Sequence, residues 1–278
     1  MSNKNQQLSN EQWQEMLNWM KNYMKSFYSA DQSIQEGILI KEKHTMQVVK
    51  IAEQLADHLK LNQHDTLLAK IIALFHDVGR FHQFAVYRTF NDAASENHAL
   101  LGIQVMQNLA CIQALSEQER RLMKFAVKNH NAKQIEITDD KKALYFAKFI
   151  RDADKLDIFR VLRPYLTQND LEPCSDEFIR QFQTGGQCDY RKMRTQNDRK
   201  LVRLLWLYDI NFTWTLQKIV NHGYVDEIIN SLPQTDDMQK GFTVLHNYIE
   251  TKLMQSDSSL ADYCVFAVHD NQYNSQLI

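Results

Sequence analysis

Residues 74–80 read Leu-Phe-His-Asp-Val-Gly-Arg, which places an imidazole directly beside a carboxylate at the end of an apolar segment. Leucine and isoleucine precede His76 at steps of four residues, so the imidazole is expected on the core-facing side of a helix. Gly79 then favours the end of that helix. Burying His76 or Asp77 is costly unless each has a partner. The sequence therefore predicts a polar site inside an otherwise apolar core.

Apolar residues at helical spacing extend outward from this segment over most of the chain. Seven Gly and three Pro residues are too few turn formers for a sandwich or barrel of many short strands. The sequence therefore predicts an all-α protein. The expected helices cover approximately residues 10–28, 38–59, 65–76, 98–109, 117–130, 141–162, 201–222, 226–232 and 237–254.

Two stretches of the chain and one proline are expected to interrupt these helices. Residues 80–97 are interpreted as an irregular loop with aromatic side chains. Pro164 is expected to stop the long helix that begins at residue 141. Residues 167–198 are polar and include a Gly-Gly pair, which indicates an insertion or a linker.

The composition limits the classes of partner. Lys and Arg number 32 against 34 Asp and Glu, a formal charge of −2, which offers no electrostatic footprint for duplex nucleic acid. No apolar run approaches the ~20 residues that a membrane helix needs. The four cysteines form no CxxC pair and no zinc spacing, which is typical of reduced thiols. With a polar start that lacks an apolar signal segment, we expect a cytoplasmic protein.

Three further histidines share with His76 a place on, or at the end of, the apolar stripe of a predicted helix. A hydrogen bond to a backbone carbonyl would explain one core histidine, but several of them with inward carboxylates favour a metal site. Imidazole together with carboxylate suits Zn, Mn, Fe, Ni or Co. The candidate ligands are His44, His76, Asp77, His98, His130 and Asp154.

Three acidic residues near this set have other interpretations. Asp152 is the rival of Asp154, but a separation of two residues along a helix turns a side chain by about 200°. Asp154 is therefore preferred, and Asp152 is expected to orient a ligand or cap a neighbour. Asp92 and Glu96 precede His98 and are interpreted either as partners that orient a ligand or as favourable charges at a helix N-terminus, and the second interpretation is preferred.

The order of the candidate ligands resembles the HD-domain superfamily of metal-dependent phosphohydrolases, and in particular its two-metal branch. The similarity covers about residues 41–162 and implies an HD-domain helical bundle with two divalent transition metal ions. The chain lacks the Gly-Tyr-Pro motif of the HD-GYP branch, so cyclic di-GMP is not the preferred substrate. The roles that the resemblance implies are the first ion for His44, His76 and Asp154, the second for His98 and His130, and a bridge between both for Asp77.

The resemblance also divides the chain into three parts. Residues 38–163 are expected to form the HD metal-binding domain, and residues 1–37 an N-terminal helix that packs on this core. Residues 164–278 are expected to be an insertion and a C-terminal helical extension of the same globule. This last part matches no motif of the family.

The resemblance implies hydrolysis of a nucleotide or another small phosphoester by a metal-bound hydroxide. Asp77 and Arg80 are the expected catalytic residues. Arg80, Arg88 and Lys155 are the cations expected to bind the phosphate of the substrate.

Two other functions stay open. The same ligands around a mixed-valent di-iron pair would suit an oxygenase that resembles myo-inositol oxygenase. The fold could also serve as a non-catalytic nucleotide-sensing module, since fold alone does not fix function. The expected partner is a small phosphorylated substrate, with neither duplex nucleic acid nor a membrane, and the sequence does not indicate an oligomeric state.

Overall fold

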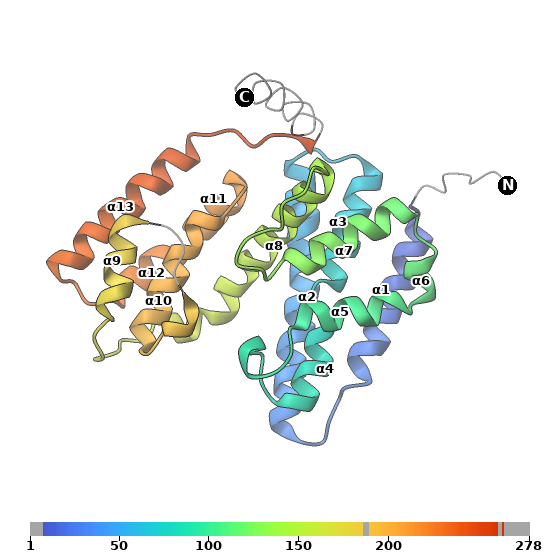
Figure 1. Cartoon of the computed structure of the whole chain (residues 1–278), viewed down its shortest axis with the longest axis horizontal. Helices are drawn as coiled ribbons and strands as arrows, with labels where there is room; N and C mark the ends of the chain where they lie inside the picture. The colour runs from blue at the N-terminus through green and yellow to red at the C-terminus, as the bar shows by residue number, and fades with distance from the viewer. Residues whose placement is uncertain (1–7, 186–188, 261–262, 264–278) are drawn as a thin grey trace, which may run out of the picture. The chain divides into compact units, whose positions relative to one another are not determined.

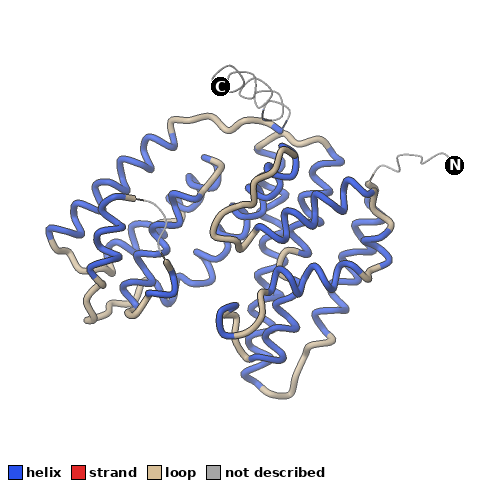
Figure 2. The backbone as a smooth tube through the Cα atoms, viewed as in Figure 1, coloured by secondary structure: helices blue, strands red, loops and turns tan. Residues whose placement is uncertain are grey.

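The computed structural model describes residues 8–185, 189–260 and 263 of the 278-residue chain. Helices joined by loops make up this part of the chain (Figure 1), and Figure 2 shows that no strand occurs in it. The all-α prediction is therefore confirmed. None of the described helices combines the length and the hydrophobicity that crossing a bilayer requires.

The described chain divides into two compact units, each of which is treated by itself. The first unit runs up to Asp154 and resumes at Ser258, and the second covers Lys155–Asp257. The predicted domain ranges 1–37, 38–163 and 164–278 stay predictions. The first unit contains α1 (Asn10–Lys25), α2 (Gln32–His58), α3 (Gln63–Phe75), α4 (Val78–Tyr87), η1 (Asp92–Ala94), α5 (His98–Gln107), α6 (Ala110–Gln113), α7 (Glu117–Asn129) and the first half of α8 (Lys141–Leu166).

Helices α2 and α3 pack along each other at the centre of the first unit, and α1 and α7 pack against α3. Val48 and Leu55 of α2 and Leu68 of α3 are fully buried, as the four-residue spacing of the apolar stripes predicts. His44 and His76 continue these two stripes. They are therefore buried with the apolar residues that precede or follow them.

A close approach between α4 and α5 sets the geometry around Asp77. A Cβ atom added at Gly79 would lie 2.2 Å from the carbonyl oxygen of His98 and 2.6 Å from the amide nitrogen of Gly102. Only a residue without a side chain permits backbones to come this close. The contact brings the start of α5, at His98, next to the start of α4, which directly follows Asp77.

The prediction of an irregular loop over residues 80–97 is wrong in its first half. The chain continues as α4 to Tyr87, and Arg88, in the left-handed region with φ of 57°, then ends the helix. The side-chain amide of Gln83, which is fully buried, donates hydrogen bonds of 2.8–2.9 Å to three acceptors in residues 92–96. These contacts hold the following segment against α4, and no local pattern encodes them.

The predicted stop of the long helix at Pro164 is also wrong, because α8 continues to Leu166. Pro164 cannot donate to the carbonyl four residues earlier, but only two residues of α8 follow it. The amide of Thr167 still donates to the carbonyl of Arg163 at 3.2 Å and closes the last turn. Beyond α8, the second unit contains α9 (Asp176–Thr184), η2 (Tyr190–Lys192), α10 (Gln196–Leu205), η3 (Trp206–Asp209), α11 (Thr213–Asn221), α12 (Tyr224–Asn230) and α13 (Asp236–Leu253).

Residues 167–198, predicted as an insertion or a linker, include α9 and an ordered network around a buried aspartate. The carboxylate of Asp198 accepts hydrogen bonds of 2.7 Å from both the amide and the hydroxyl of Ser175. It also accepts from the amides of Arg194 and Thr195, at 3.0 and 3.2 Å. The described residues of this segment, 167–185 and 189–198, are therefore part of the second unit's packed structure, with α9 lying against α13, and Gly186 lies outside the described residues.

Candidate metal centre

The predicted ligands converge inside the first unit. They come from α2, from the junction between α3 and α4, from the start of α5, from the end of α7 and from α8. The ligand atoms of five of them form two groups, each within 4.8 Å, with Asp77 in both. The sixth, Asp154, lies beside the histidines of the first group. The six residues, none more than 9% exposed, are His44, His76, Asp77, His98, His130 and Asp154.

The first group surrounds one oxygen of Asp77. His44 Nε2 and His76 Nε2 lie 3.5 and 3.6 Å from Asp77 Oδ2. The same two nitrogens lie 3.1 and 3.6 Å from Asp154 Oδ1. Each of the two imidazole nitrogens therefore lies within 3.6 Å of an oxygen of Asp77 and of an oxygen of Asp154.

The second group surrounds the other oxygen of Asp77. His98 Nε2 lies 3.2 Å and His130 Nε2 lies 3.5 Å from Asp77 Oδ1. The two imidazole nitrogens lie 2.9 Å from each other. The two oxygens of one carboxylate thus face different pairs of histidines.

The hydrogen bonds on the far side of each ring decide which nitrogen carries a lone pair. Nδ1 of His76 lies 2.7 Å from the carbonyl oxygen of Ala73, and Nδ1 of His130 lies 2.7 Å from that of Val127. Because a carbonyl oxygen only accepts, Nδ1 donates in both rings, and the lone pair of the neutral ring stands on Nε2. This is the arrangement that orients a histidine as a metal ligand.

His98 obtains the same orientation from a carboxylate. Its Nδ1 lies 2.8 Å from both oxygens of Asp92. With Nδ1 donating to Asp92, the Nε2 lone pairs of His98 and His130 face each other at 2.9 Å. Two lone pairs at this distance repel unless a cation lies between them. Of the two interpretations of Asp92, the partner of the histidine is confirmed, and the preferred one, a charge at a helix N-terminus, is wrong.

Further atoms of the centre have no hydrogen bond within the protein. Among the described residues, His76 Nε2 and Asp77 Oδ1 are buried side-chain atoms of this kind. Buried polar atoms are costly to leave without partners. The donor set and these atoms fit a pair of divalent ions, for which neutral imidazole and carboxylate are suitable ligands.

The ionisation states favour cation binding as well. Burial acts to raise the pKa of Asp77, but the ammonium of Lys41 and the neighbouring imidazoles hold it well below its usual value. Burial likewise opposes ionisation of Asp154, yet His44 and His76 hold its pKa well below the usual value. Burial lowers the pKa of His130 to about 4. Ionised carboxylates and a neutral imidazole are the forms that bind metal ions.

Arg80, a predicted catalytic and substrate-binding residue, lies beside the bridging carboxylate. Its Nε is 3.6 Å from Asp77 Oδ1. Its Nη1 donates to Gln83 Oε1 at 2.7 Å, to the carbonyl of Phe90 at 2.6 Å and to Asp92 Oδ1 at 2.9 Å. These contacts tie α4 to the segment that holds His98. Contact of Arg80 with a substrate stays a prediction.

The other two predicted substrate cations pair with carboxylates that are not among the candidate ligands. Arg88 is half exposed, and its Nη1 lies 3.2 Å from Asp31. Lys155 belongs to the second unit, where its ammonium donates to Asp209 at 2.7 Å. Their roles in substrate binding stay predictions.

Sequence reasoning missed two cations that contact the centre. Lys41 Nζ donates to Asp77 Oδ2 at 2.6 Å. The nearly buried Arg151 donates from Nη1 to the carbonyls of Asn129 and Ala132, at 2.9 and 2.6 Å, and so fixes the chain on both sides of His130. Lys41 could have been found, because a residue three positions before His44 lies on the same face of α2.

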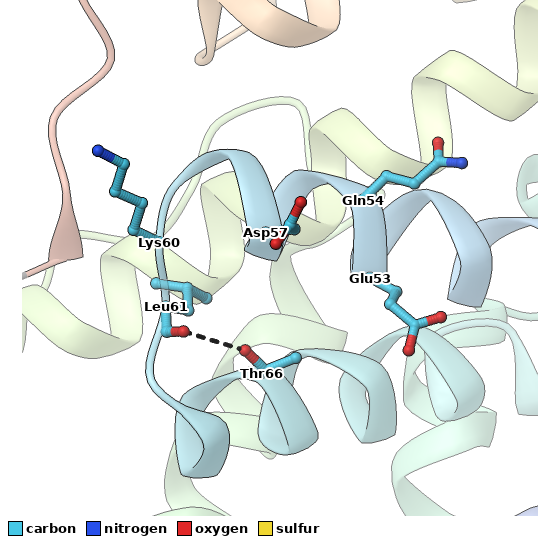
Figure 3. A pocket seen from close by; sticks show the side chains of 6 residues that line it. All are labelled: Glu53, Gln54, Asp57, Lys60, Leu61 and Thr66. Atoms are coloured by element: carbon cyan, nitrogen blue, oxygen red, sulfur yellow. Dashed lines mark hydrogen bonds between the residues drawn. The ribbon is translucent and has the colours of Figure 1, made fainter.

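A groove on the first unit lies apart from these groups. It is lined by side chains of α2, α3 and the turn between them, and the hydroxyl of Thr66 donates to the carbonyl of Leu61 at 3.4 Å (Figure 3). Along α2, at 1.5 Å per residue, Glu53 is about 14 Å from His44. The groove contains none of the six candidate ligands and is not part of the centre. Its lining residues are Glu53, Gln54, Asp57, Lys60, Leu61 and Thr66.

Comparison with known proteins gives one family. No curated protein and no solved structure matches the chain. The model of the SidE phosphodiesterase (PDE) domain matches residues 9–228, about four fifths of the chain, and this range includes all six candidate ligands. This family is a different one from the HD superfamily, so the resemblance is supported only by the His and Asp groups. The chain belongs to the SidE phosphodiesterase domain family.

Proposed function

We propose that the chain is a metal-dependent phosphohydrolase that cleaves a phosphodiester in a nucleotide or another small phosphoester. Membership of a phosphodiesterase family supports the reaction type. The observation that carries the metal dependence is the pair of His and Asp groups that share Asp77. These His and Asp groups are also the part of the resemblance to two-metal HD phosphohydrolases on which the proposal draws.

Two divalent ions, of Fe, Mn, Zn, Ni or Co, would occupy the two groups. His44, His76 and Asp154 would hold the first, and His98 and His130 the second. Asp77 would bridge them, since Oδ2 faces the first pair of histidines and Oδ1 the second. When bound, such ions activate water at neutral pH and offset charge on phosphoryl oxygens.

The protein's own residues keep this centre rigid. Asp92 holds Nδ1 of His98, and backbone carbonyls hold Nδ1 of His76 and His130, so three Nε2 atoms keep fixed directions. Burial of all six side chains excludes bulk water and strengthens the electrostatic interaction with an anionic substrate. Arg80, next to Asp77, is the proposed cation for the substrate phosphate, with Arg88 and Lys155 as further candidates.

The test compares metal-free and metal-loaded protein. The full chain is stripped with a chelator, reloaded with Mn²⁺, Fe²⁺, Zn²⁺, Ni²⁺ or Co²⁺ and assayed on bis(p-nitrophenyl) phosphate and p-nitrophenyl phosphate. We expect diester hydrolysis that requires metal, with two ions per chain by elemental analysis. Absence of hydrolysis with every ion would refute the proposal.

A variant pair locates the activity. His76→Ala should lose at least one metal equivalent and the metal-dependent turnover, because it removes a ligand of the first group. His82→Gln changes an exposed imidazole of α4 outside both groups and should retain both. Equal metal content in the two variants would remove the ligand role from His76.

A further inference from the structure

Lys41 occupies a position that a metal ligand set does not require. Its ammonium lies 2.6 Å from Asp77 Oδ2, the oxygen that also faces His44 and His76. The side chain is 14% exposed, so this charge-assisted hydrogen bond is largely shielded from water. One positive charge is therefore already placed on the oxygen that the first metal ion would use.

The charge balance of the first group makes this contact significant. Asp77 and Asp154 supply two negative charges, and Lys41 offsets one of them. A divalent ion bound to Asp77 Oδ2 would lie within a few ångströms of the ammonium, and like charges at that distance repel strongly in a poorly solvated site. An ion in the second group would be repelled less by a protein cation, because Arg80 Nε is 3.6 Å from Asp77 Oδ1.

The ammonium of Lys41 has a second possible interaction, with an aromatic ring. Lys41 Nζ lies 5.3 Å from the centre of the Phe90 ring, which stacks on Phe84 with 4.3 Å between ring centres. The face of an aromatic ring attracts a cation at this range. A lysine side chain has four flexible methylene groups, so its ammonium can leave Asp77 and stay over the ring.

We propose that Lys41 is an internal cation that competes with the first metal ion for Asp77. Metal binding to the first group displaces the ammonium from Oδ2, whereas binding to the second group does not. The two sites therefore load unequally, the second before the first. The inference rests on the proposed function, because it concerns the same metal centre.

The experiment measures metal affinity rather than turnover. Chelator-stripped full-length protein is titrated with Mn²⁺ by calorimetry, with electron paramagnetic resonance to count bound ions. Lys41→Met removes the charge at similar length. We expect the weaker of the two sites to bind about 10- to 100-fold more tightly, the factor that corresponds to the net worth of one charge-assisted hydrogen bond. The tighter site should change by less than about threefold.

Two controls separate charge from packing. Lys41→Arg keeps the charge and should bind Mn²⁺ like the wild type. Lys70→Met removes a lysine of similar exposure, 15%, which pairs with Glu53 at 2.8 Å and lies 4.8 Å from the Trp13 ring centre. Lys70 is in the same unit but outside both groups, so its loss should leave both affinities unchanged.

The outcomes distinguish this inference from the proposed function. If the wild type binds two ions and Lys41→Met binds neither more tightly, the competition is refuted and the metal centre stands. If the wild type binds no divalent ion, the proposed function fails first. If Lys41→Met folds only when Mn²⁺ is bound, a titration of the metal-free variant is not possible. The measurement is then the rate at which a chelator removes the weaker ion. A rate no slower than that of the wild type refutes the competition.

Discussion

Replacing Gly79 with Ala tests how the contact between α4 and α5 positions the candidate metal centre. The new Cβ would start 2.2 Å from the carbonyl oxygen of His98 and 2.6 Å from the amide nitrogen of Gly102. Ordinary contacts begin near 3.4 Å, and both obstacles are backbone atoms. The two helices must therefore move apart by about 1 Å, because neither obstacle can rotate away as a side chain could.

The expected magnitude follows from this displacement. Overpacking costs about 1–3 kcal/mol and here should reach the upper end. Alanine recovers about 0.5–1 kcal/mol of it through its better helix propensity. We therefore expect Gly79→Ala to lose about 2 kcal/mol of unfolding free energy in urea denaturation. A shift of about 1 Å also exceeds the ~0.2 Å tolerance of metal–ligand distances, so the second group should lose its ion.

Gly102→Ala is the matched control. Its Cβ would lie 3.2 Å from Cγ1 of Val78, a side-chain atom that can move by a few tenths of an ångström. This variant should stay within about 1 kcal/mol of the wild type, since the gain in helix propensity offsets the tight contact. The reasoning is refuted if both variants unfold at the same urea concentration and retain the same metal content.

Two further variants test the partners of buried groups. Asp92→Asn removes the carboxylate that bonds to His98, and we expect the affinity of the second group for Mn²⁺ to fall about 10- to 100-fold in calorimetric titration; an unchanged titration would contradict this role. Asp198→Asn tests acid sensitivity: hydrogen bonds hold the pKa of Asp198 below its unfolded value, although burial acts to raise it. Its stabilising contribution is therefore complete above about pH 4 and is lost as the pH falls through the folded-state pKa. Urea unfolding at pH 7 and pH 3 should show a larger loss of stability for the wild type than for Asp198→Asn, and equal losses would count against the network.

Helical periodicity was sufficient to predict the fold class and the burial of the histidines, whereas their arrangement around Asp77 was expected from the resemblance to the HD superfamily. His44 and His76 continue apolar stripes, and a residue on such a stripe is buried whatever its chemistry. The same spacing selects Asp154 on α8, whose Oδ1 lies 3.1 Å from His44 Nε2. At the start of α1, Ser9 and Gln12 form a capping box, a contact between residues only three positions apart.

The features that escaped prediction depend on contacts between distant parts of the chain. The buried side-chain amide of Gln83 holds the loop after α4 against the helix, because it donates hydrogen bonds to a segment about ten residues later. Lys41 acquires its role only because Asp77, 36 positions later, lies against it. The partners of Asp92 are likewise set by tertiary packing. Local propensity gives no information on such pairings, which arise when helices pack.

A break in the backbone explains how two adjacent residues serve two groups. His76 caps α3 with helical angles, φ −55° and ψ −39°, whereas Asp77 leaves the helical region with φ −109° and ψ 15°. Asp77 then stands at the N-terminus of α4, where the partial positive charge of the helix end favours a carboxylate. Its side chain makes no capping hydrogen bond, so both oxygens stay available to other groups. An aspartate that capped α4 would commit an oxygen to the backbone, and the bridge between the two histidine pairs would be lost.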